Sequence, residues 1–167
     1  MTMSALAMIE LFAGKRPDGS AVVERLQVKV IEGKGDESDA CELVKSPAFV
    51  QGIASGDLIK LNKDENTFEL LKRSGNLCVR VLSKEPISPL AQDLIPQFEK
   101  LGGSIDFENE RMLVFSIHVS CGFSPVEALL NEYIDEELGS MWVYGNVYDP
   151  ADGVTPLKWW LDILKPQ

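Results

Sequence analysis

Hydrophobic and polar positions repeat regularly along the second half of the chain, and the period of the repeat changes from one segment to the next. Residues 77–82 alternate in period two, which is typical of a strand. Ser88-Pro89 then marks a helix start, an apolar stripe recurs at helical spacing as far as Leu101, and Gly102-Gly103 marks the end of the helix. A strand followed by a helix is therefore predicted.

The same reading continues through the rest of this half. Residues 104–107 and 112–121 predict a hairpin around a polar turn. Ser124-Pro125-Val126-Glu127 predicts a second helix, because it combines an N-cap serine, a first-position proline and a capping-box glutamate. A last strand is predicted over 141–148. This order is that of the ferredoxin-like βαββαβ unit, in which both helices cover one face of a four-stranded sheet.

The first half has short apolar runs separated by turn clusters, which favours a small β domain. Residues 8–12 and 21–31 predict a hairpin, and shorter strands are predicted near 41–44, 58–61 and 67–72. The predicted fold class is thus α+β. Its parts are a small bent antiparallel sheet or partial barrel in residues 1–76, the ferredoxin-like unit in 77–148, and a linker with a C-terminal helical tail in 149–167.

Charge narrows the choice of partners. With 26 acidic and 16 basic side chains the formal net charge is −10. Such a chain repels nucleic-acid phosphates and anionic lipid, so neither nucleic acid nor a membrane is expected as a partner. A basic or neutral protein partner is favoured instead.

The apolar start of the chain and the cysteines bear on location. Residues 1–13 lack a basic leader and contain Glu10, so we interpret them as part of the fold and not as an export signal. Cys41, Cys78 and Cys121 are widely separated and odd in number, which indicates neither a disulfide framework nor a zinc site. A cytoplasmic protein is expected.

Several motifs together resemble a known family. They are Glu24-Arg25-Leu26-Gln27-Val28, Ser46-Pro47-Ala48-Phe49 with the following Gly52-to-Ile59 stretch, Arg73-Ser74-Gly75-Asn76, Leu101-Gly102-Gly103 and Met112-Leu113-Val114. In these residues the chain, from about Met8 to Tyr148, resembles a bacterial family of proteins with a domain of unknown function. The resemblance implies a small two-part α+β protein and carries no established activity.

One face of the predicted second sheet gathers chemically capable side chains. In residues 112–121 the odd-numbered apolar positions should face the helices, which leaves the even-numbered ones on the other face. If Val143 and Val147 also face the helices, the aromatic residues between them join that other face. The face is either a platform for a small molecule or peptide, or is buried by the N-terminal domain. Its candidate binding residues are Arg80, Ser116, His118, Trp142 and Tyr144.

No catalytic constellation emerges from the pattern. His118 and Cys121 lie three apart on a predicted strand and would point to opposite faces. The acidic cluster Asp36, Glu37 and Asp39 lacks the regular alternation of a calcium loop. We therefore assign no catalytic, cofactor-binding or metal-binding residue, and no cofactor is expected.

The tail adds one more candidate surface. Trp159 and Trp160 belong to a short apolar segment that either caps the protein's own core or docks a partner. The favoured function is a noncatalytic binding or regulatory protein, for example an immunity-like inhibitor of a basic protein. The alternatives are a small-molecule-binding domain with weak hydrolase or transferase activity that uses Arg80, His118 and Tyr144, and a homodimeric structural protein.

Overall fold

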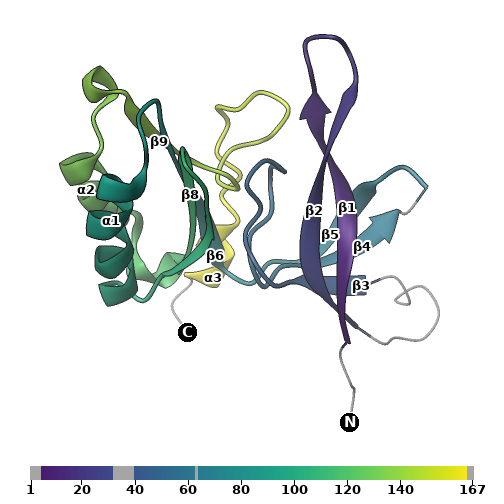
Figure 1. Ribbon diagram of the computed structural model, residues 1–167. Helices are drawn as coiled ribbons and strands as arrows, with labels where there is room; N and C mark the ends of the chain where they lie inside the picture. The colour runs from purple at the N-terminus through teal and green to yellow at the C-terminus, as the bar shows by residue number, and fades with distance from the viewer. Residues whose placement is uncertain (1–4, 32–39, 63, 165–167) are drawn as a thin grey trace.

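The computed structural model describes residues 5–31, 40–62 and 64–164, and it is an α+β structure with two antiparallel sheets (Figure 1). The acidic cluster Asp36, Glu37 and Asp39 lies outside the described residues. Among the helices that are described, none has the length and apolar character needed to cross a membrane.

The first sheet has its strands in sequential order, and its first two strands form the predicted hairpin. The sheet bends far enough for β1 to touch β5, and the Phe12 amide donates to the Asn66 carbonyl at 2.8 Å. Its core lies inside this bend, around Leu11, Val28 and Ile59. The strands are β1 (Ala5–Lys15), β2 (Ala21–Val30), β3 (Ala40–Leu43), β4 (Leu58–Asn62) and β5 (Thr67–Lys72).

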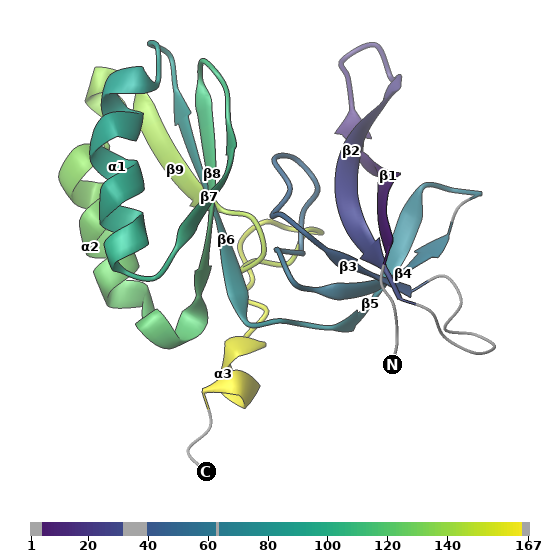
Figure 2. The same cartoon turned by 60° about the horizontal axis from the view of Figure 1, so that its bottom comes forward.

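The second sheet has the order β7-β8-β6-β9, with every neighbouring pair antiparallel. Figure 2 shows α1 and α2 side by side over one face of this sheet, with the first sheet on the opposite side. The elements are β6 (Asn76–Ser83), α1 (Ser88–Lys100), β7 (Ser104–Glu108), β8 (Met112–His118), η2 (Val119–Cys121), α2 (Phe123–Tyr133), η3 (Glu136–Leu138), β9 (Ser140–Tyr144) and α3 (Trp160–Ile163).

The core between the helices and this sheet follows the predicted alternation. Phe98 of α1 stacks on Phe115 of β8 with ring centroids 4.0 Å apart. The odd-numbered apolar residues of β8 share that core with those of β6, which confirms the predicted register of both strands. The predicted capping box was wrong, because α2 begins at Phe123, two residues before the predicted first position Pro125, and no described side chain caps it.

A segment of the N-terminal part covers the other face of the second sheet. We call residues 46–57 the bridging segment. Its Ala48 and Ala54 are buried in one cluster with Cys78 of β6 and Val114 of β8. The N-terminal part therefore packs on the face that the helices leave uncovered, which is the second of the two alternatives left by the sequence.

Opposite charges hold the two sides of the bridging segment. The Glu24 carboxylate of β2 accepts from the backbone amides of Ala48 at 2.6 Å and of Phe49 and Val50 at 2.9 Å each. From the other sheet, Arg80 Nε and Nη2 donate to the Pro47 carbonyl at 3.2 and 3.1 Å, and Nη2 also donates to the Val50 carbonyl. Arg80 is only 3% exposed. These contacts form what we call the Glu24–Arg80 clamp.

A buried hydroxyl cluster supports the clamp. Ser116 of β8 meets the hydroxyl of Ser46 at 2.5 Å and that of Ser55 at 2.8 Å, and it donates to the Asp106 carboxylate. Asp106 also accepts from the Ser46 amide at 2.7 Å. Among the described residues, no buried side-chain nitrogen or oxygen lacks a hydrogen-bond partner, as buried polar groups require.

Removal of the Arg80 guanidinium should loosen the two halves. Arg80→Met keeps an apolar stem but leaves the Pro47 and Val50 carbonyls without their buried donor. We expect the free energy of unfolding to fall by about 2–4 kcal/mol. Urea denaturation measures this loss. The matched control is Arg25→Met, which changes an exposed arginine on β2 and should stay within about 0.5 kcal/mol of the parent; equal effects of the two substitutions would contradict the clamp.

Candidate functional site

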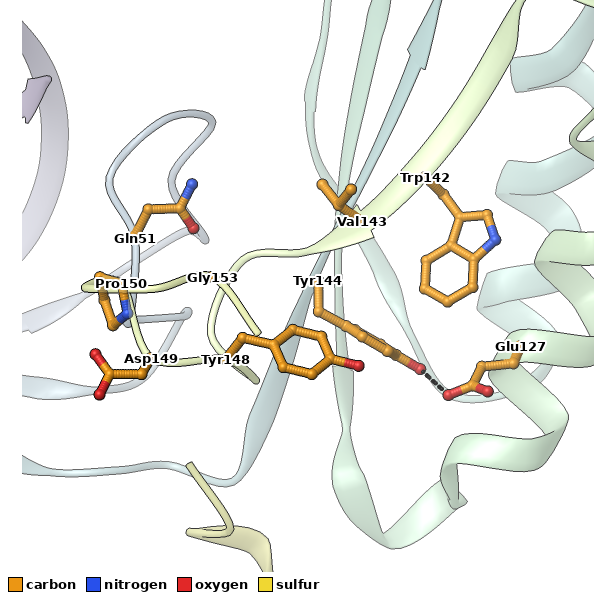
Figure 3. Close-up of a pocket in the computed structure, with 9 residues that line it drawn as sticks. All are labelled: Gln51, Glu127, Trp142, Val143, Tyr144, Tyr148, Asp149, Pro150 and Gly153. Atoms are coloured by element: carbon orange, nitrogen blue, oxygen red, sulfur yellow. Dashed lines mark hydrogen bonds between the residues drawn. The ribbon is translucent and has the colours of Figure 1, made fainter. Parts of the chain in front are cut away.

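A groove of about 510 Å³ lies where β9, α2 and the loop 148–153 meet (Figure 3). Its volume is within the range of roughly 300–1,000 Å³ that is usual for ligand pockets. We call it the β9 groove. It is lined by Gln51, Glu127, Trp142, Val143, Tyr144, Tyr148, Asp149, Pro150 and Gly153.

The chain can form this groove because it leaves the sheet at Gly145. The Gly145 amide donates to the Cys78 carbonyl at 2.8 Å, and the Gly145 carbonyl accepts from the Gly52 amide at 2.8 Å. A Cβ at this position would lie 2.7 Å from Cys78 Sγ and 2.9 Å from Arg80 Cζ, so only glycine fits so close to the clamp. The loop 148–153 then runs back to form the far wall.

Aromatic rings make up one wall of the groove. The rings of Trp142 and Tyr144 meet edge to face with centroids 5.0 Å apart, and Phe123 of α2 packs on Tyr144 at 5.7 Å. Trp142 Nε1 donates to Asn131 Oδ1 at 3.0 Å. Figure 3 shows the Tyr148 ring beside that of Tyr144, on the side opposite to Val143.

The hydroxyl of Tyr144 is tied to a carboxylate. It donates to Glu127 Oε2 at 2.9 Å. Burial raises the pKa of Tyr144 above its usual value, and the hydrogen bond and negative charge of Glu127 raise it further. Tyr144 therefore stays protonated and acts as a fixed donor that orients Glu127 in the groove.

The charge of the groove has one sign. Glu127 and Asp149 are its carboxylic acids, and the described residues that line it include no lysine, arginine or histidine. Gln51, with its amide assigned from its partners, accepts from Arg80 Nη1 at 3.1 Å and donates to the Gly145 carbonyl at 3.0 Å. Aromatic faces beside carboxylates are the surroundings that attract an organic cation.

The structure divides the predicted binding face. Arg80 and Ser116 lie on it but are buried beneath the bridging segment. Trp142 and Tyr144 lie on the helix face instead, since they pair with Val81 and Val79 of β6. Their predicted orientation was wrong because β9 ends at Tyr144. Val147 is buried with the core as predicted, but the turn after Tyr144 breaks the alternation and leaves Val143 on the opposite face.

His118 has a local structural role. It is exposed at the end of β8, where Nδ1 meets the Ser120 hydroxyl at 2.8 Å and accepts from the Ser120 amide at 3.1 Å. A Cβ on Gly75 would lie 2.4 Å from His118 Nε2, which explains a glycine in that turn. Cys121 ends the next turn, η2, and makes no hydrogen bond to His118. In the described ranges no three metal-ligating side chains converge.

The tail docks on its own chain through both tryptophans. Trp159 Nε1 donates to the Asn146 carbonyl at 2.8 Å, and Arg73 lies over the Trp159 ring at 5.2 Å. Trp160 packs on Phe123 with centroids 5.1 Å apart. Both rings are half-buried, so these contacts favour the capping role over a free partner-docking patch.

Sequence reasoning missed most of the groove. The sequence pattern places Glu127 in a capping box and Gln51 between two predicted strands. Tyr148, Asp149 and Pro150 were split between a strand end and a linker. The available signal is the run of aromatic and acidic residues around Tyr144. A prediction with a shorter last strand would have placed these residues at the edge of the second sheet.

The sequence of the chain matches a known family model. The model of a domain of unknown function (DUF4265) matches residues 21–141. The chain belongs to the DUF4265 family. This confirms the resemblance to a family without established activity. The DUF4265 match includes Glu24, Arg80 and the whole bridging segment, and it ends just before Trp142.

This DUF4265 chain also shares its fold with a solved structure. It is similar to a crystal structure titled a hypothetical protein from Neisseria gonorrhoeae, with a TM-score of 0.63 and 16% sequence identity, over 86% of this chain and 94% of the other. That likeness shows a shared fold. No curated protein matches the chain.

The Tyr144 hydroxyl should make stability fall at alkaline pH. The unfolded tyrosine ionises near pH 10 whereas the folded one stays protonated, so its contribution is complete below about pH 10 and is lost as pH rises further, at roughly 1.4 kcal/mol per pH unit. Tyr144→Phe should remove this slope and cost about 1–2 kcal/mol at pH 7. Urea denaturation between pH 7 and 11 measures both effects.

Tyr133→Phe is the matched control. It also removes a hydroxyl from the same region, one that makes no hydrogen bond within the described residues. It should keep the alkaline slope of the parent. A Tyr144→Phe variant with the parent slope would show that the Tyr144 hydroxyl is not held in its protonated form by the fold.

Proposed function

We propose that this protein is a noncatalytic binding protein whose β9 groove receives a cationic side chain of a basic protein partner. The observation that carries the proposal is the composition of the groove. Trp142, Tyr144 and Tyr148 supply aromatic surface, Glu127 and Asp149 supply negative charge, and no lining residue supplies a competing cation. A lysine or arginine side chain satisfies both kinds of surface at once.

The charge of the whole chain supports the same partner. A net charge of −10 attracts a basic protein over a distance and raises its rate of association. The groove then supplies the short-range recognition. An immunity-like inhibitor of a basic protein is one specific form of this function, and a bacterial cytoplasmic location accords with three free cysteines.

We also assign the parts of the fold. Residues 77–148 are proposed to form a ferredoxin-like unit, because the order β9-β6-β8-β7 with both helices on one face is what that motif requires. Residues 1–76 are the small β domain, and 149–167 are the linker and tail. The groove lies at the junction of all three parts, where a partner contacts each of them.

The rival site loses its geometric support. A small-molecule site with hydrolase or transferase activity was to combine Arg80, His118 and Tyr144. Arg80 is buried under the bridging segment and Tyr144 lies on the opposite face of the sheet. His118 is on β8 and pairs with Asn76, outside the stretch of β6 that pairs with β9. Of these three residues, the β9 groove is lined by Tyr144 and not by Arg80 or His118.

Small cationic probes test the proposal directly. N-acetyl-arginine methylamide should bind with millimolar affinity and shift the indole N–H signal of Trp142 in an NMR titration. The citrulline analogue has nearly the same shape but no charge and should bind roughly tenfold more weakly. Equal binding of the two probes, or no shift at the Trp142 indole, would overturn the proposal.

A conservative substitution locates the charge. Glu127→Gln keeps an acceptor for the Tyr144 hydroxyl but removes the negative charge, so arginine-probe affinity should fall roughly fivefold. Glu132→Gln, on the exposed face of the same helix, is the matched control and should leave the affinity unchanged. Equal losses in the two variants would mean that binding follows net charge and not the groove.

A further inference from the structure

The outer edge of β9 offers unpaired backbone groups. Among the described strands, β9 pairs with β6 alone, so its other side is an open edge of the second sheet. The Gly145 amide and the Gly139 carbonyl both bond to the β6 strand or its extension. Because inward and outward groups alternate in an antiparallel pair, Val143 and Met141 also face β6, whereas Trp142 and Tyr144 direct their backbone groups outward.

Those outward groups have no partner in the described part of the chain. The backbone hydrogen bonds of the described residues include none from Trp142 or Tyr144 on that side. The neighbouring outward amide, that of Ser140, is satisfied by the Asp135 carbonyl at 3.1 Å. The part of the β9 edge with unpaired backbone groups is therefore short, and it lies directly along the groove.

The groove reaches around this edge. It is lined by Trp142, Val143 and Tyr144, which are consecutive residues that point to alternate faces of the sheet. A cavity can touch all of them only from the side of the strand. Figure 3 agrees, since Val143 and Tyr144 leave the ribbon of β9 in opposite directions while both border the groove.

We infer that an extended basic segment of the partner adds to β9 as an extra strand. The inference rests on the proposed function and names the form in which the cation arrives. Main-chain hydrogen bonds to Trp142 and Tyr144 supply affinity, and the groove supplies specificity, as in other cases of strand addition. The loop 148–153 closes the outer side of the added strand.

The geometry also sets the pattern of the segment. Side chains of an added strand lie beside those of their neighbours on the same face. Residues on the face of Trp142 and Tyr144 meet the aromatic wall and Glu127, so they should be cationic. Residues in between lie next to Val143, which is 37% exposed, so they should be apolar.

Charge selects a partner chain over a second copy of this protein. β9 has the sequence Ser-Met-Trp-Val-Tyr and carries no basic residue. A second β9 paired along the edge would bring neither lysine nor arginine to Glu127 and Asp149. A basic segment neutralises both carboxylates, whereas a second copy adds a like-charged chain of −10.

Selective methylation of a peptide backbone tests strand addition. The probe is a hexapeptide of alternating arginine and valine with blocked ends, titrated into the intact protein by NMR. An added strand directs every other amide at β9. N-methylation of either all arginine or all valine amides should therefore weaken binding more than tenfold, and methylation of the other set should change it less than threefold.

The remaining outcomes separate this inference from the proposed function. Equal effects of the two methylated sets would overturn strand addition, while binding of N-acetyl-arginine methylamide would leave the groove function standing. If neither the hexapeptide nor N-acetyl-arginine methylamide binds, both strand addition and the proposed groove function are overturned. Sedimentation without peptide tests the remaining occupant. A dimer that is lost in the Trp142→Pro variant but kept in the Trp142→Ala variant would assign the edge to a second copy and overturn the inference.

Discussion

The arrangement of this protein depends on the Glu24–Arg80 clamp. Residues 47–50 present amides toward the first sheet and carbonyls toward the second, and each set meets a charge of the appropriate sign. Arg80 lies in the interface almost without exposure, and its described hydrogen bonds all go to oxygens of the bridging segment. Separation of the two sheets would break these charge-assisted hydrogen bonds together, so the segment fixes how the two halves meet.

This constraint limits which surfaces of the second sheet a ligand can reach. A four-stranded sheet has two faces and two outer strands, and here the helices fill one face while the bridging segment covers much of the other. Through Gly145 and Gln51 the same clamp also places the loop after β9 against the N-terminal part. The side of β9 remains accessible and is bordered by rings and carboxylates of the groove. The candidate site is thus a product of how the parts are joined.

The sequence predicted those features that depend on local periodicity. The alternation in β6 and β8 identified their buried sides correctly, because both are central strands whose two faces differ in polarity. It failed at β9, where a strand of five residues is too short for alternation to survive the turn at Gly145. The tertiary partners of Glu24 lie at least 24 residues away and those of Arg80 at least 29, and no local pattern encodes such contacts. The groove was missed for this reason, whereas the family was recognised from short motifs.

The reactivity of Cys78 depends on the contact between the two halves. Its thiol is fully buried beside Arg80 and the Pro47 carbonyl, and burial raises its pKa to about 11. Because only a thiolate reacts readily with oxidants and alkylating reagents, the closed molecule keeps this sulfur chemically inert. Any motion that lifts the bridging segment would hydrate the thiol and restore its ordinary acidity. The rate at which an alkylating reagent labels Cys78 therefore measures how often the two halves separate.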